Sequence, residues 1–193
     1  MKNAKRFEIR IAGFGGQGVV TVGKILGTAF TVFEGQNTVN TQSYGPESRG
    51  GACRSEVIVS KGQINYPQVR AADVFIALSQ PALDTYLEGL KPGGILVIDP
   101  HAVKTVPAAE RFTVYEIPTM ALARTVGGLK FQNAVALGAL LPLFKGALSE
   151  DSLRKALAEN VPPETLENNL AALTEGMTYL REHYAVPDRG ATP

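Results

Sequence analysis

Residues 7–21 read FEIRIAGFGGQGVVT, a run of β-prone residues that passes through four glycines within residues 13–18 into a stretch compatible with a helix. A strand that feeds through glycines into a helix brings bare backbone N–H groups and the positive end of the helix dipole to one point. Such a point suits phosphate groups or close contact with the backbone of another chain. Gly13, Gly15 and Gly18 also satisfy G-x-G-x-x-G, a dinucleotide fingerprint that is weak on its own.

A second glycine-rich segment, SYGPESRGGACR at residues 43–54, follows where a dinucleotide-binding protein places other residues. Arg49 in this segment could bind a phosphate or carboxylate through two parallel hydrogen bonds. The alternative for Arg49 is an ion pair with Glu47 or Glu56. Cys53 stands beside Arg54, but no histidine is near it in sequence, so a buried and inert thiol is the favoured interpretation.

Strand-like and helix-like segments alternate over the first two-thirds of the chain. The continuous apolar runs at residues 73–78 and 94–99 are typical of central parallel strands that are covered on both faces. The rhythm predicts an α/β fold, a Rossmann-like three-layer sandwich with a mostly parallel sheet, in which the second and third strands add an antiparallel edge. The expected strands are 7–12, 36–41, 54–60, 73–78, 94–99 and 112–117; helices are expected at 21–35 and 81–90, and a turn at 91–94.

The last third of the chain is predicted to be helical. Residues 131–144 are apolar nearly all round and are expected to be buried, and Ser149 is expected to cap a helix that runs to about residue 160. A helix over residues 164–183 carries an apolar stripe, which packs either on its own sheet or on another subunit: Leu166, Leu170, Leu173, Met177 and Leu180. We expect one domain over residues 1–186 and a flexible tail over 187–193.

Composition narrows the function classes. The chain has 193 residues, of which 45% are hydrophobic and 19% charged, and its net charge of +1 gives no electrostatic basis for binding nucleic acid or a membrane surface. The basic start is followed by a stretch that charges and glycines interrupt, which predicts neither a signal peptide nor a membrane span, and hence a cytoplasmic protein. One cysteine and two distant histidines cannot hold an iron–sulfur cluster, so redox centres are expected on a partner.

Other chemistries find little support in the sequence. An NAD-binding fold places an acidic residue about 20 residues beyond the glycines, whereas residues 40–43 read NTQS. Ser79 and Gln80 follow a predicted strand and are secondary binding candidates, because ligand sites in α/β folds lie at the carboxyl ends of strands. No Ser/His/Asp arrangement, convincing carboxylate pair or Walker A loop is present, so we predict no catalytic residue and no metal site.

Four motifs together resemble the gamma subunit of 2-oxoacid:ferredoxin oxidoreductases, most closely the 2-oxoglutarate type. They are GFGGQGV at residues 13–19, SYGPESRGG at 43–51, ADV at 72–74 and ALSQ at 77–80. The resemblance spans about residues 7–184. It implies an enzyme complex that oxidatively decarboxylates a 2-oxoacid on thiamine diphosphate, passes two electrons through iron–sulfur clusters to ferredoxin, and releases an acyl-CoA.

In such complexes the gamma module is associated with assembly and with the CoA side of the reaction. Thiamine diphosphate, Mg and the iron–sulfur clusters are then expected on alpha and beta subunits, and on a delta subunit where one is present. CoA is the co-substrate, and this chain binds no cofactor alone. We hypothesise that one group of residues forms the partner or cofactor face and its adjoining loop: Gly15, Gly16, Gln17, Gly18, Ser43, Tyr44, Glu47 and Arg49.

Two other functions stay open at this point. One is a self-sufficient NAD(P)-binding oxidoreductase, and the other is a purely structural assembly module in which the glycines form only a packing turn. The identity of the 2-oxoacid also stays open, because gamma subunits for pyruvate, branched-chain and 2-oxoglutarate enzymes share these motifs.

Overall fold

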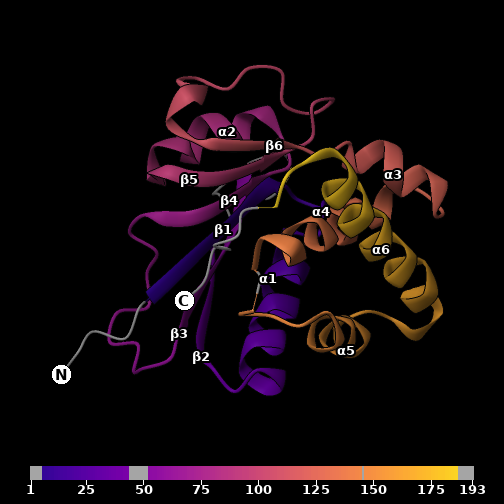
Figure 1. Ribbon diagram of the computed structural model, residues 1–193, viewed down its shortest axis with the longest axis horizontal. Helices are drawn as coiled ribbons and strands as arrows, with labels where there is room; N and C mark the ends of the chain where they lie inside the picture. Colours follow the sequence, from indigo (N-terminus) through magenta and orange to yellow (C-terminus); the bar gives the residue numbers. More distant parts are fainter. Residues whose placement is uncertain (1–5, 44–51, 145, 187–193) are drawn as a thin grey trace.

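A six-stranded sheet organises the computed structural model, which describes residues 6–43, 52–144 and 146–186 (Figure 1). The strand order is β2-β3-β1-β4-β5-β6. Of the strands, β3 alone runs against the others, since it pairs antiparallel with both β1 and β2 while β1, β4, β5 and β6 pair in parallel. The strands are β1 (Arg6–Phe14), β2 (Asn37–Ser43), β3 (Ala52–Ser60), β4 (Ala72–Ala77), β5 (Leu90–Ile98) and β6 (Thr113–Glu116). The predicted mostly parallel sheet with an antiparallel edge is confirmed.

Each face of the sheet carries its own apolar core. Along β1, Ile9 and Ile11 belong to one buried cluster, and Ala12 belongs to the other. Figure 1 shows α1 (Val19–Thr28), α4 (Gln132–Leu140), α5 (Glu150–Asn160) and α6 (Leu166–His183) gathered on one side of the sheet, and α2 (Gln80–Tyr86) on the other. Because successive side chains of a strand point to opposite faces, a strand covered on both faces is apolar throughout. The predicted three-layer sandwich is therefore confirmed.

The helix expected over residues 21–35 has two parts. It begins at Val19, and after Thr28 it continues as a single π-helical turn, Ala29–Phe33. Gly35 then adopts a positive φ of 65°, a left-handed conformation that ends the helix. The backbone N–H of Gln36 donates to the carbonyl of Phe30 at 2.9 Å, which completes the exit from the helix.

The prediction of a turn over residues 91–94 is wrong, because this segment lies inside β5. Ala72 pairs with Leu90 but Val74 pairs with Ile95, so the extra residues of β5 form a bulge. Gly93 has a φ of 74° there, which only glycine adopts without strain. The helix expected over residues 81–90 is also shorter, since α2 ends at Tyr86 and a 3-10 turn, Leu87–Gly89, leads into the strand.

The C-terminal third is helical, as predicted. It comprises α4, α5 and α6, with a 3-10 turn on each side of α4, Leu129–Phe131 and Leu141–Phe144; the short helix before it, α3 (Thr119–Thr125), was not predicted. Every residue of α4 after its first is buried. The Ser149 hydroxyl accepts the backbone N–H of Ser152 at 3.1 Å and caps α5.

The apolar stripe of α6 packs within its own domain. Leu173, Met177 and Leu180 lie in the same buried cluster as the side chains of α4. The two helices approach so closely that a Cβ at Gly138 would clash with the carbonyl of Leu173, and a Cβ at Gly176 with the carbonyl of Val135. The stripe therefore packs on α4 in the core of its own domain, rather than directly on the sheet as one of the two alternatives had it. The predicted tail over residues 187–193 lies outside the described residues.

We predict that Gly138→Ala destabilises the chain by about 1–3 kcal/mol, because the added methyl group forces α4 and α6 apart. Gly27→Ala is the matched control, since a Cβ at this helical glycine meets only Asn40 Cβ at 3.8 Å. The control should be neutral, or more stable by up to about 1 kcal/mol through helix propensity. Urea unfolding followed by circular dichroism measures both. Equal stability of the two variants would contradict the close packing of α4 on α6.

Candidate functional site

The C-terminal ends of β1 and β4 form the point where the chain changes direction across the sheet. These strands are parallel neighbours, with Ala12 paired to Ala77. The connection after β1 leads into α1 on one face, whereas the connection after β4 leads into α2 on the other. Loops that leave neighbouring strands toward opposite faces open a crevice between them, and open α/β sheets bind ligands in such crevices. Both the first glycine motif and the Ser79-Gln80 pair therefore follow strands that end side by side at this edge of the sheet.

The loop after β1 is a tight glycine turn. The backbone N–H of Gln17 donates to the carbonyl of Phe14 at 3.2 Å. Gly16 and Gly18 have φ values of 91° and 74°, in the left-handed region where a side chain is strained. Gly18 is the N-cap of α1, and a Cβ on it would also clash with the Asn133 amide. The loop thus needs glycine at both positions for reasons internal to the chain.

The Gln17 side chain ties this loop to the end of β4. Its Oε1 accepts the backbone N–H of Phe14 at 2.6 Å, and its Nε2 donates to the carbonyl of Leu78 at 3.0 Å. Both ends of the amide are therefore engaged within the chain. Gln17 fixes the position of the glycine turn relative to the start of α2.

Among the described residues, none covers the outer side of the glycine turn. A Cβ at Gly15 or Gly16 would meet no atom within 4 Å. Within the part of the chain that the structure describes, the N–H groups of Gly15, Gly16 and Gly18 have no hydrogen-bond acceptor. The first turn of α1 follows directly and contains no acidic residue. Open N–H groups at the start of a helix suit an anion or a carbonyl from another chain.

Ser79 and Gln80, which follow β4, stabilise the start of α2 and the segment that packs against it. Ser79 is buried, and its hydroxyl accepts the backbone N–H of Ala82 at 3.4 Å as the N-cap of α2. The Gln80 amide accepts from the N–H of Lys104 at 2.8 Å and of Thr105 at 3.1 Å, and it donates to Asp84 Oδ1 at 2.9 Å. These contacts hold the β5–β6 connection against α2.

Of the second glycine-rich segment, residues 43–54, the structure describes only Ser43 and residues 52–54. Ser43 lies at the exposed end of β2, the edge strand, so β3 separates it from the glycine turn that follows β1. Tyr44, Glu47 and Arg49 lie outside the described residues, and their assignment to the site stays a prediction.

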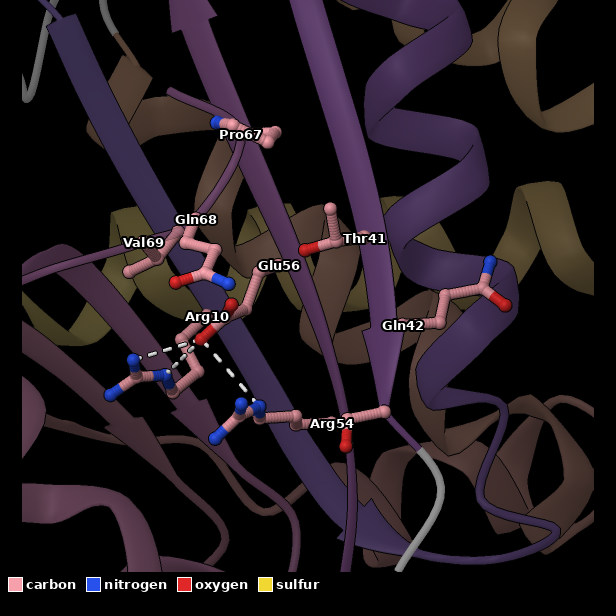
Figure 2. A pocket seen from close by; sticks show the side chains of 9 residues that line it. Arg10, Thr41, Gln42, Arg54, Glu56, Pro67, Gln68 and Val69 are labelled. Carbon is pink, nitrogen blue, oxygen red and sulfur yellow. Dashed lines mark hydrogen bonds and ion pairs between the residues drawn. The ribbon is translucent and has the colours of Figure 1, made fainter.

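A buried ion pair was not anticipated from the sequence. Arg10 in β1 is 6% exposed, and its Nε and Nη2 lie 2.9 Å and 2.8 Å from Glu56 Oε1 in β3. The Nε of Arg54 lies 3.7 Å from the same oxygen. These side chains border a cavity of about 380 Å³ (Figure 2). The antiparallel register places Arg10 opposite Glu56. This register could have predicted the ion pair, but it cannot be derived from the sequence of either strand alone.

The remaining reactive side chains are isolated from one another. Cys53 is buried, and burial raises the pKa of its thiol, as expected of an inert cysteine. His101 and His183 are exposed. Within residues 6–43, 52–144 and 146–186, no three His, Cys, Asp or Glu side chains gather to hold a metal ion.

Of the helices in the described part of the chain, none is by itself long and apolar enough to cross a bilayer. Two consecutive helical segments, Thr119–Thr125 and Leu129–Phe144, are together long and apolar enough, but the chain bends by 120° between them.

We predict that Gln17→Ala frees the glycine turn from β4 and speeds hydrogen exchange of the Phe14 amide, with a loss of about 1–3 kcal/mol for two hydrogen bonds. Gln17→Glu should lose only the bond to the Leu78 carbonyl and should therefore have a smaller effect, because its carboxylate can still accept the Phe14 N–H but cannot donate. Gln36→Ala is the control, since it removes a single amide bond to the Ala147 carbonyl elsewhere. If Phe14 exchanges as slowly in Gln17→Ala as in the unmodified chain, the amide does not hold the turn.

Comparison with known proteins gives consistent matches over most of the chain. The family model described as pyruvate ferredoxin/flavodoxin oxidoreductase matches residues 8–179. The chain is 41% identical over 183 residues to the 2-oxoglutarate synthase subunit KorC of Methanothermobacter thermautotrophicus, covering 92% of this chain and 96% of that protein. It is 41% identical over 179 residues to the KorC subunit of Methanocaldococcus jannaschii, covering 92% and 95%.

Solved structures agree. The gamma subunit of a keto/oxoacid ferredoxin oxidoreductase from Geobacter sulfurreducens superimposes with a TM-score of 0.81 at 37% identity, covering 91% of this chain and 99% of that one. A 2-oxoglutarate:ferredoxin oxidoreductase from Magnetococcus marinus, solved with 2-oxoglutarate, coenzyme A and succinyl-CoA bound, gives 0.85 at 27% identity, covering 98% of this chain and 33% of that one. The chain that carries this glycine turn between the ends of β1 and β4 therefore belongs to the pyruvate ferredoxin/flavodoxin oxidoreductase family.

Proposed function

We propose that this chain is the gamma subunit of a 2-oxoacid:ferredoxin oxidoreductase complex of the 2-oxoglutarate type. The complex converts 2-oxoglutarate or a related 2-oxoacid, CoA and oxidised ferredoxin into acyl-CoA, CO₂ and reduced ferredoxin. The support is the 41% identity to the KorC subunits over nearly their whole length. The predicted location of the complex is the cytoplasm.

The proposed role of this chain is to bind and position rather than to carry out the chemical steps. The observation that carries it is the open outer side of the glycine turn, where Gly15, Gly16 and Gly18 present N–H groups. These groups and the N-terminus of α1 favour a negatively charged or carbonyl oxygen. We assign them to a phosphate of CoA or to the backbone of a partner subunit, and we assign no catalytic residue to this chain.

The proposed partners are alpha and beta subunits, with a delta subunit where one is present, and ferredoxin through the complex. Thiamine diphosphate, Mg and iron–sulfur clusters would lie on those partners. Two longer relatives support the proposal that this chain works next to partner subunits. The chain spans 37% of the ketoisovalerate oxidoreductase subunit VorA of Methanothermobacter thermautotrophicus, to which it is 34% identical, and 33% of the Magnetococcus marinus chain. In both, a homologous module is covalently joined to further segments.

The NAD(P) alternative loses support from the sheet topology. A dinucleotide fold places the ribose-binding acid at the C-terminal end of the strand adjacent to β1. Here that neighbour is β3, which runs antiparallel and therefore begins, rather than ends, beside the glycine turn. The end of β2 reads Asn40, Thr41, Gln42 and Ser43 and carries no carboxylate.

The test is Gly15→Ala in the complex reconstituted with its partner subunits. A methyl group at Gly15 meets no atom of the described residues within 4 Å, and the Gly15 backbone does not have the positive φ that requires glycine, so the isolated fold should be unchanged. The methyl group occupies the space that a ligand or partner backbone would approach. We expect the KM for CoA to rise, or assembly to weaken, by about tenfold or more, the effect of losing one charged hydrogen bond.

Gly27→Ala at the other end of α1 is the control and should assemble and turn over like the unmodified complex. A raised KM for CoA with intact assembly would identify CoA as the ligand of the turn. Weakened assembly with an unchanged KM would identify a partner subunit instead. If Gly15→Ala behaves like the control in both respects, the glycine turn serves packing alone and the purely structural alternative is correct.

A further inference from the structure

A polar cavity of about 380 Å³ lies on the sheet face opposite α1 (Figure 2). It is walled by β1, β2 and β3 and by the segment before β4, through Thr41, Ser43, Arg54, Glu56, Gln68 and Val69. The register pairs Thr41 with Glu56 and Ser43 with Arg54, so these side chains lie on one face of the sheet. The volume exceeds that of a single water molecule many times over.

Among the described residues that line this cavity, the charges do not balance. Two guanidinium groups, of Arg10 and Arg54, share one carboxylate, Glu56. Arg10 approaches Glu56 Oε1 within hydrogen-bond distance through two nitrogens, and its Nη1 donates to the carbonyl of Tyr86 at 3.3 Å. The Nε of Arg54 stays 3.7 Å from Oε1, beyond a hydrogen bond. Among the described lining residues, Glu56 therefore neutralises Arg10, and the positive charge of Arg54 has no carboxylate within hydrogen-bond distance.

Arg54 is also held in position. Its guanidinium lies over the Tyr86 ring, 5.2 Å from the ring centroid, and its side chain is only 37% exposed. Among the described residues, its N–H groups make no hydrogen bond, although a guanidinium carries five donors. A planar cation that is stacked on a ring, with its donors unused, has the geometry that binds a carboxylate through two parallel bonds.

Neutral donors complete the site. Within the described part of the chain, the Thr41 hydroxyl and the Gln68 Nε2 have no hydrogen-bond partner, and both residues line the cavity. Gln68 Oε1 accepts the Tyr66 hydroxyl at 2.7 Å, which fixes the orientation of the amide. Pro67 and Val69 add an apolar wall. A cavity with one excess positive charge and neutral donors matches a single negative charge on a small organic group.

We propose that this cavity binds a carboxylate through Arg54, assisted by Thr41 and Gln68. The carboxylate belongs either to a free organic acid or to an acidic side chain of a partner subunit, since the recognition chemistry is the same. The proposal does not rest on the proposed function, because it concerns another face of the sheet and can be tested on the isolated chain.

The test is titration of the isolated chain with propionate, followed by NMR of the arginine Nε–Hε resonances, with inorganic phosphate as a second probe. We expect a saturable shift of the Arg54 resonance with propionate. Arg54→Gln should weaken propionate binding by about tenfold or more, and Thr41→Val by a smaller factor, about two- to tenfold.

Arg111→Gln is the matched control. Arg111 also stacks on an aromatic ring, 5.3 Å from the Phe112 centroid, and lies 3.9 Å from a glutamate oxygen of Glu88, with 43% of its side chain exposed, but it does not line the cavity. This variant should bind propionate like the unmodified chain. No saturable shift at Arg54, equal binding by Arg54→Gln, equal loss in Arg111→Gln, or phosphate bound more tightly than propionate would each overturn the proposal.

The same titration on the assembled complex separates the two sources of the carboxylate. Retained propionate binding supports the site and assigns it to a free acid. Loss of binding on assembly, with Arg54→Gln also weakening assembly, supports the site and assigns it to a carboxylate of the partner. Loss of binding with normal assembly of Arg54→Gln would overturn a role for Arg54 in the complex.

Discussion

The Gln17 side chain joins the turn after β1 to the end of β4, and the geometry of the candidate site depends on this bridge. Its amide accepts from Phe14 and donates to the Leu78 carbonyl, so one residue closes the glycine turn and anchors it beside α2. The left-handed Gly16 and Gly18 then direct N–H groups outward. The Gln17 side chain bonds to backbone groups on both sides of the turn, and the N–H groups of the turn have no acceptor among the described residues. This division explains why so short a loop contains both four glycines and a glutamine.

The antiparallel strand β3 is the second constraint. It lies between β1 and β2, so the fold keeps the glycine turn of a nucleotide-binding sheet but lacks the adjacent parallel strand that carries a ribose-binding acid. The same strand brings Glu56 against Arg10 in the middle of the sheet. Burying this pair is costly unless both charges are hydrogen-bonded, and removing one partner leaves the other charge buried and uncompensated. Arg54 lies near the start of β3, and its guanidinium N–H groups have no hydrogen-bond acceptor among the described residues.

Much of the fold follows from patterns within single segments. The apolar runs of β4 and β5 predict central strands because both faces are covered, and Ser149 predicts the start of α5 because its hydroxyl caps a helix. The bulge in β5 was not predicted, since proline and glycine normally end a strand, whereas here β4 pairs with the residues on either side of it, Leu90 and Ile95. The bond from Gln17 to Leu78 and the Arg10–Glu56 pair join residues 61 and 46 positions apart, which no local pattern encodes. Of the predicted site residues, Tyr44, Glu47 and Arg49 lie outside the described residues.

The central claim is that the outer side of the glycine turn is covered by CoA or by a partner chain when the subunit works. Hydrogen exchange at the N–H groups of Gly15, Gly16 and Gly18 measures this directly, because these groups have no acceptor among the described residues of the isolated chain. Our account predicts fast exchange in the isolated chain and exchange slowed by about tenfold or more, the equivalent of one net hydrogen bond, in the assembled complex with CoA. Equally fast exchange in both states would contradict it.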